Sequence, residues 1–169
     1  MKFVYLSFYY FFAYNLPNSF FPLGSLFNKI RIKTLRRIIT IGKECKIQSK
    51  VYIGKGSNVS IGNYCQINEN SKLDNVIIGS YVMIAAGTTI LGKMHKYSSR
   101  EIPMVLQGES VIKPTIIEDD VWIGTNAIIM PGLKLSKGSI IGAGSVLTKS
   151  TDPYSIYGGV PAKFIKKRS

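Results

Sequence analysis

Aliphatic residues recur at every sixth position over most of this chain, and this period constrains the fold more than any other feature. The longest unbroken series is Ile117, Ile123, Ile129, Leu135, Ile141 and Leu147. Shorter series precede it: Ile41, Ile47 and Ile53; Ile61, Ile67 and Leu73; Ile78, Ile84 and Ile90. A helix repeats about every 3.6 residues and a strand about every two, so neither explains the spacing. The period predicts a solenoid in which a short strand and a turn alternate and the aliphatic side chains stack inside.

The other positions of the repeat suit a narrow interior. A small or β-branched residue stands four places after the aliphatic one in nearly every unit, which keeps the core from being overfilled. Glycine often follows the aliphatic residue, where we expect it to ease a turn with positive φ. The glycines at this position are Gly42, Gly54, Gly62, Gly79, Gly124 and Gly142. We therefore predict an all-β repeat domain over residues 41–152.

One long segment, residues 91–116, interrupts the repeat. It has no six-residue pattern, and it contains His95, the single histidine of the chain. Loops of this length inside a compact repeat are uncommon and are usually functional. Two small slips in the period also occur, between residues 53 and 61 and between residues 73 and 78.

The net charge of +13 is concentrated at the two ends of the chain. Residues 1–40, the N-terminal arm, carry six cations and no acidic residue, and the basic tail, residues 153–169, carries four cations in its last seven positions. Between these ends the charges nearly balance. This distribution favours an anionic ligand or surface at the ends and argues against a nucleic-acid groove along the molecule.

The arm combines an aromatic run with a basic, helix-like stretch. Residues 3–14 are apolar, but about 20 such residues are needed to span a bilayer. Residues 25–37 place apolar side chains at roughly helical spacing with lysines and arginines between them. Two hypotheses remain: a helix at the membrane interface, or an arm packed on its own domain or on a neighbouring subunit. In either case we expect the arm to contribute little to the fold.

Two cysteines and one histidine are too few for a zinc cluster, which needs about four such ligands, so we expect no metal. Cys45 and Cys65 occupy equivalent places in their repeats and are predicted to stack on adjacent coils. In a reducing cytoplasm we expect both to remain free thiols.

Four segments resemble the hexapeptide-repeat acyltransferases, in particular the O-acetyltransferases of sugars and surface polysaccharides. They are residues 93–109 (KMHKYSSREIPMVLQGE), 117–132 (IEDDVWIGTNAIIMPG), 140–149 (IIGAGSVLTK) and 157–167 (YGGVPAKFIKK). The resemblance implies a left-handed parallel β-helix of about five coils, with a helical N-terminal arm and a short C-terminal helix or tail. It also implies acetyl-CoA as co-substrate and a homotrimer with active sites between neighbouring helices.

By this resemblance His95 is the general base. An acceptor hydroxyl is a poor nucleophile at neutral pH, and an imidazole, whose ordinary pKa is about 6.5, is suited to take its proton. Transfer is then direct, without a covalent enzyme intermediate. Relatives often orient the histidine through a carboxylate or a carbonyl; Glu101 and Glu109 are the nearest acids, and the spacing does not choose between them.

The resemblance also assigns the acetyl-CoA contacts. Trp122 packs near the cofactor, and Thr125 and Ala143 lie where backbone groups contact it. The phosphates of coenzyme A are expected to meet Lys149, Lys163 and Lys166.

For the acceptor, the aromatic and basic arm resembles that of relatives that build capsule or lipopolysaccharide O-antigen, whose acceptors are often lipid-linked. We therefore expect a cytoplasmic enzyme, peripheral at the inner face of the membrane. Two alternatives stay open: acetylation of a small acceptor such as serine, a simple sugar or an antibiotic, and a β-helix that serves only as a scaffold.

Overall fold

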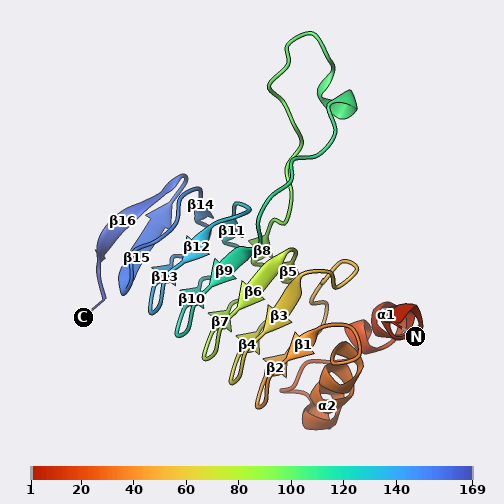
Figure 1. Ribbon diagram of the computed structural model, residues 1–169. Coiled ribbons are helices and arrows are strands. Elements are labelled where there is room, and N and C mark those ends of the chain that lie inside the picture. Colours follow the sequence, from red (N-terminus) through yellow and green to blue (C-terminus); the bar gives the residue numbers. More distant parts are fainter. Residues whose placement is uncertain (1, 169) are drawn as a thin grey trace.

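Three sheets, parallel except for the terminal strand of one, form the three faces of a solenoid in the computed structural model, which describes residues 2–168 (Figure 1). The first sheet contains β1 (Thr40–Ile41), β3 (Val59–Ile61), β6 (Val76–Ile78), β9 (Thr115–Ile117) and β12 (Lys134–Leu135). The second contains β2 (Lys46–Ile47), β4 (Gln66–Ile67), β7 (Met83–Ile84), β10 (Trp122–Ile123), β13 (Ile140–Ile141), β15 (Ser155–Gly159) and β16 (Ala162–Lys167). The third contains β5 (Lys72–Leu73), β8 (Thr89–Ile90), β11 (Ile128–Ile129) and β14 (Val146–Leu147). The first sheet has one strand for each of the five expected coils, and the second sheet extends further, to seven strands.

The aliphatic residues of the repeat form the core. Ile123 is in register with Ile84 and Ile141 on the coils below and above it, and all three are buried. Ile129 is likewise in register with Ile90 and Leu147 on the third sheet. The prediction of stacked aliphatic residues inside a parallel β-helix is confirmed.

Glycine follows the aliphatic residues for a different physical reason from the positive φ that we expected. Of the six, only Gly54 has a positive φ. A Cβ on Gly62 would lie 2.4 Å from the carbonyl oxygen of Gly79, and one on Gly124 would lie 2.5 Å from the backbone nitrogen of Ala143. Gly62, after a strand of the first sheet, and Gly124, after a strand of the second, are needed because the backbones of successive coils approach too closely at these two corners for a side chain.

Two helices and a short 3₁₀ turn make up the arm: α1 (Lys2–Phe11), η1 (Ala13–Asn15) and α2 (Gly24–Leu35). They pack against the first coil and cover the N-terminal end of the solenoid (Figure 1). Arg31 on α2 is fully buried and donates to the carbonyl oxygens of Ala13, Ile47, Leu16 and Pro17. No helix among the described residues has the length and apolar character needed to cross a bilayer.

The arm is therefore packed on its own domain, and the expectation that it contributes little to the fold is wrong. The fully buried Tyr9 donates its hydroxyl to the carbonyl of Val51 at 2.6 Å, which links α1 to the first coil. Without the arm, the core residues of the first coil would face water.

The C-terminal segment also differs from expectation. Instead of a short helix, residues 155–167 form β15, which pairs in parallel with β13, and β16, which returns antiparallel to β15. This pair extends the second sheet beyond the last coil.

Cys45 and Cys65 lie on adjacent coils as expected, buried and unbridged. Each thiol donates to a glycine carbonyl oxygen at 3.1 Å, Cys45 to that of Gly62 and Cys65 to that of Gly79. The neighbouring Cys45 thiol and burial together raise the pKa of Cys65.

Candidate active site

The segment that carries His95 leaves the solenoid at the corner between the third and first sheets and projects far from it (Figure 1). Its two limbs are joined near the root by two backbone hydrogen bonds, from Lys96 N to Gly108 O (3.0 Å) and from Ser110 N to Met94 O (2.8 Å). Further out, the loop contains a 3₁₀ turn, η2 (Met104–Leu106). The root of the loop is thus a short antiparallel ribbon.

His95 and Glu109 face each other across this ribbon, where they form an antiparallel bridge. Because the two hydrogen bonds flank this pair and do not join it, it is a non-hydrogen-bonded pair, the type in which side chains lie closest. Cβ atoms of such pairs are about 5 Å apart on the same face. Glu101 lies further out on the loop, so the geometry favours Glu109 as the carboxylate beside His95.

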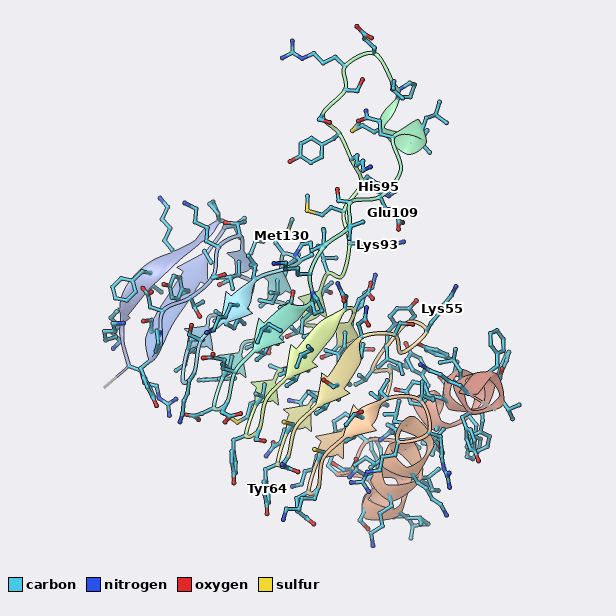
Figure 2. All side chains as sticks on the ribbon, viewed as in Figure 1. Lys55, Tyr64, Lys93, His95, Glu109 and Met130 are labelled. Atoms are coloured by element: carbon cyan, nitrogen blue, oxygen red, sulfur yellow. The ribbon has the colours of Figure 1, made fainter. Side chains whose placement is uncertain are left out.

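Lys93 completes this group, because it is two residues before His95 on the same limb and points to the same face. Its ammonium forms an ion pair with Glu109 (Figure 2). The hydrogen bond from Lys93 lowers the pKa of Glu109, and the positive charge of Lys93 acts in the same direction. The same ion pair raises the pKa of Lys93.

Asn75, which the sequence analysis did not single out, holds the root of the loop. Its side-chain amide donates to the carbonyl of Gly92 at 3.3 Å and to that of Ile112 at 3.1 Å, one on each limb. The available signal was the slip in the six-residue period between residues 73 and 78, where Asn75 lies. The limbs are therefore clamped at the solenoid, and His95 sits just beyond the clamp.

Gln107 closes the outer part of the loop. Its amide accepts from Ser99 N at 3.2 Å and donates to the carbonyls of Ser99 at 3.0 Å and Ile102 at 2.6 Å. The glutamine of the Gln-Gly element thus has a structural role in this chain, because its hydrogen bonds join the returning limb of the loop to the outgoing one.

The residues assigned to acetyl-CoA fall mainly on one edge of the solenoid, at and beside the corner between the second and third sheets. Thr125 and Ala143 are exposed on adjacent coils of this corner, where Gly144 N donates to Thr125 O at 2.8 Å. With the flanking Gly124 and Gly142 they form a strip without large side chains. Such a strip leaves backbone groups accessible to a thin, extended ligand, which fits the pantetheine arm.

Trp122 and Lys166 share one row across the second sheet. Trp122 is in register with Ile140, Ile140 with Ile156, and Ile156 with Lys166. Three strand steps separate the ends of the row, about 14 Å at the usual strand spacing. Lys163 pairs with Gly158, next to Gly142.

Lys149 does not join this group. It follows β14, at the corner from which the His95 loop projects. Within one chain the third sheet separates that corner from Thr125 and Ala143. The structure thus brings together Trp122, Thr125, Ala143, Lys163 and Lys166, and it places His95 and Lys149 on a different edge.

A parallel β-helix with an extruded loop between two coils defines the class of hexapeptide-repeat proteins, and the fold here is their left-handed β-helix. The family model described as bacterial transferase hexapeptide (six repeats) matches residues 58–92 and 114–149. The chain belongs to this family, and the resemblance drawn from the sequence is confirmed.

The chain is similar to several acetyltransferases. A chloramphenicol acetyltransferase of Klebsiella aerogenes is 36% identical over 115 residues, which are 59% of this chain and 55% of the relative. A galactoside O-acetyltransferase of Escherichia coli K12 is 33% identical over 131 residues, 76% of this chain and 63% of the relative. The solved structure of a galactoside acetyltransferase in complex with coenzyme A superposes with a TM-score of 0.81 at 26% identity, covering 99% of this chain and 80% of that one. The chain thus spans little more than half the length of the chloramphenicol acetyltransferase it matches.

Proposed function

We propose that this protein is an acetyl-CoA-dependent O-acetyltransferase that acetylates a sugar hydroxyl during synthesis of a surface polysaccharide, with His95 as general base. The observation that carries the proposal is the ribbon at the loop root, where a clamped backbone holds His95 opposite Glu109. Binding of coenzyme A by a galactoside acetyltransferase of the same fold supports the donor.

In this mechanism the imidazole of His95 takes the proton of the acceptor hydroxyl as its oxygen attacks the thioester carbonyl of acetyl-CoA. The bond from carbonyl carbon to oxygen forms, the carbon–sulfur bond breaks, and His95 returns the proton to the departing thiolate of coenzyme A. Glu109 positions the imidazole and stabilises its protonated form. Lys163 and Lys166 neutralise phosphate charge and take no part in the bond changes.

The proposed assembly is a homotrimer. In one copy His95 lies on a different edge from Thr125 and Ala143, so a neighbouring copy would be needed to bring base and donor together. The loop tip also exposes Met104, Val105 and Leu106, apolar residues that a neighbouring subunit would cover. A monomeric mass by light scattering at micromolar concentration would count against the trimer.

The proposed acceptor is lipid-linked and the proposed location is the cytoplasmic face of the membrane. Support comes from the position of the arm, because α1 contacts the solenoid at the corner that carries the loop. Tyr10 donates to the carbonyl of Gly54 at 2.8 Å, and Lys2 donates to that of Gly56 at 3.4 Å. The loop leaves the same corner two coils further on, about 10 Å along the axis.

A second candidate function is acetylation of a small acceptor, which the similarity to chloramphenicol and galactoside acetyltransferases favours. The deciding experiment measures release of coenzyme A from acetyl-CoA in the presence of chloramphenicol, simple galactosides and lipid-linked glycan fragments. Turnover confined to the glycan fragments supports the first proposal, and turnover confined to a small acceptor supports the second. If no acceptor supports turnover and the cell-surface glycan is unacetylated, the remaining hypothesis is a β-helix that serves only as a scaffold.

A further inference from the structure

The outward face of α1 is apolar, although it faces solvent. Phe3, Val4, Phe8 and Phe11 lie on one side of the helix at positions that recur each turn, and only Ser7 is polar among them. Phe3 is 79% exposed and Phe11 is 87% exposed. Phe12 continues this face, with its ring centre 5.2 Å from that of Phe8. Elsewhere the arm exposes further apolar residues: Phe20, Phe21, Leu23 and Leu26. Soluble proteins rarely expose aromatic side chains in such number without a partner.

Cations border this apolar surface. A groove of about 480 Å³ between α1 and α2 is lined by Val4, Phe8 and Ile30 and by the side chains of Lys33 and Arg37. Arg37 also lies over the ring of Tyr5, with its guanidinium carbon 5.7 Å from the ring centre. The groove is therefore apolar inside and positively charged at its rim.

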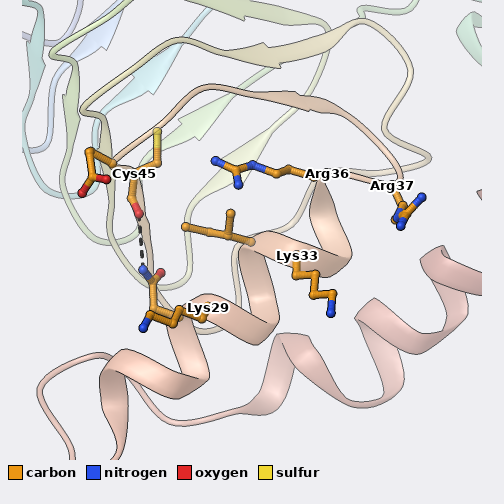
Figure 3. A pocket seen from close by; sticks show the side chains of 8 residues that line it. Lys29, Lys33, Arg36, Arg37 and Cys45 are labelled. Atoms are coloured by element: carbon orange, nitrogen blue, oxygen red, sulfur yellow. Dashed lines mark hydrogen bonds between the residues drawn. The ribbon is translucent and has the colours of Figure 1, made fainter.

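A second, larger cavity continues the basic rim along α2. It measures about 580 Å³ and is lined by Lys29, Lys33, Arg36 and Arg37 (Figure 3). Its only acidic lining residue is Glu44, and the arm itself contains no acid. Aromatic side chains beside an uncompensated row of cations match the interface of an anionic bilayer, where rings enter the headgroup region and cations meet phosphates.

We infer that the outward faces of α1 and α2 are a docking surface for an anionic phospholipid membrane, with Phe3 and Phe11 entering the headgroup region and Lys33 and Arg37 on the phosphates. A second copy of this chain fits the surface poorly, because two such faces would bring cations against cations.

Docking in this way has a consequence for the loop. Tyr10 of α1 lies against Tyr52 on the first coil, with ring centres 5.7 Å apart, and the turn after it carries Lys55. Lys55 and Lys93 mark the corner that runs from the arm to His95 (Figure 2). A membrane at α1 would therefore lie at the end of the edge on which the loop stands. This consequence for the loop rests on the proposed function, because it concerns a lipid-linked acceptor. The inference that α1 and α2 bind a membrane does not rest on the proposed function.

The test is cosedimentation of the full-length protein with vesicles of phosphatidylcholine alone and of phosphatidylcholine mixed with phosphatidylglycerol. Wild type should sediment with the mixed vesicles and weakly with the neutral ones. The double variant Lys33→Gln/Arg37→Gln should bind about 30-fold more weakly, because each cation near an anionic surface contributes about a fivefold gain. A matched control, Lys113→Gln/Lys137→Gln, makes the same charge change on exposed lysines far from the arm and should bind like wild type.

The aromatic contribution has its own variant, Phe3→Ser/Phe11→Ser, with Val160→Ser as a control at an exposed apolar site on the far end. The first should lose binding to mixed vesicles and the second should keep it, with both folded by circular dichroism. Equal binding to both vesicle types, or wild-type binding by the Phe3→Ser/Phe11→Ser variant, would overturn the inference. A third result would also overturn it: wild type fails to bind vesicles, and the Phe3→Ser/Phe11→Ser variant has a smaller assembly mass than wild type. That result would show that a second copy of the chain covers the surface.

A separate assay tests the proposed acetyl transfer. Release of coenzyme A with a water-soluble acceptor needs no vesicle. If wild type releases none yet still binds vesicles, the enzyme function is rejected and the docking inference stands. The arm variants should retain that soluble turnover.

Discussion

Replacing His95 with alanine separates a catalytic role from a structural one. His95 is exposed on a loop outside the stacked coils, so the free energy of unfolding should change by less than about 0.5 kcal/mol. If His95 is the base, kcat should fall by about 10²–10⁴, the usual effect of losing a positioned proton acceptor. That corresponds to a rise of about 3–5 kcal/mol in the barrier. Affinity for acetyl-CoA should stay nearly unchanged, because Trp122, Thr125 and Ala143 lie on another edge of the chain.

The assay is steady-state release of coenzyme A, with unfolding followed in urea and acetyl-CoA binding by calorimetry. The wild-type rate should rise with pH as imidazole loses its proton, and the variant should lose this inflection. Lys96→Ala is the control, because its side chain points to the opposite face of the same ribbon; its kcat should be near wild type. A His95→Ala protein that folds, binds acetyl-CoA and turns over at a near-normal rate would refute the mechanism.

Four other predictions concern binding, stability and titration. Lys166→Ala should raise the KM for acetyl-CoA in steady-state kinetics and leave kcat close to wild type, because it removes binding that ground and transition states share. Arg31→Leu should lower the free energy of unfolding in urea by about 3 kcal/mol or more, since each orphaned buried carbonyl costs about 1–3 kcal/mol, whereas the exposed Lys29→Leu should change it little. The Glu109 carboxyl should titrate by NMR below its ordinary pKa of 4.5, so the ion pair is lost only as the pH falls below that value; Lys93→Met should move the midpoint upward. Both cysteine thiols should react with a thiol reagent in denaturant and remain protected in the native protein, and a native protein without free thiols would contradict this.

Much of the site follows from family motifs, but its geometry does not. Trp122, Thr125 and Ala143 are recognisable in the sequence, and the structure places them along one edge. The choice between Glu101 and Glu109 needed the backbone of the loop, because His95 and Glu109 are fourteen residues apart in sequence. Their pairing depends on the register of the two limbs, which hydrogen bonds to carbonyl groups set and which no residue pattern displays.

The six-residue period by itself determined the solenoid. Aliphatic residues such as Ile84, Ile123 and Ile141 leave water together only if one coil lies on the next, so the pattern has a single solution. Tertiary structure alone decided how the ends are closed and where the loop is held. Arg31 is one of six cations in an arm that looks solvated in sequence, yet its position over the open end of the first coil gives it four carbonyl partners. Burial of a charge depends on partners distant in sequence, and a local pattern carries no record of them.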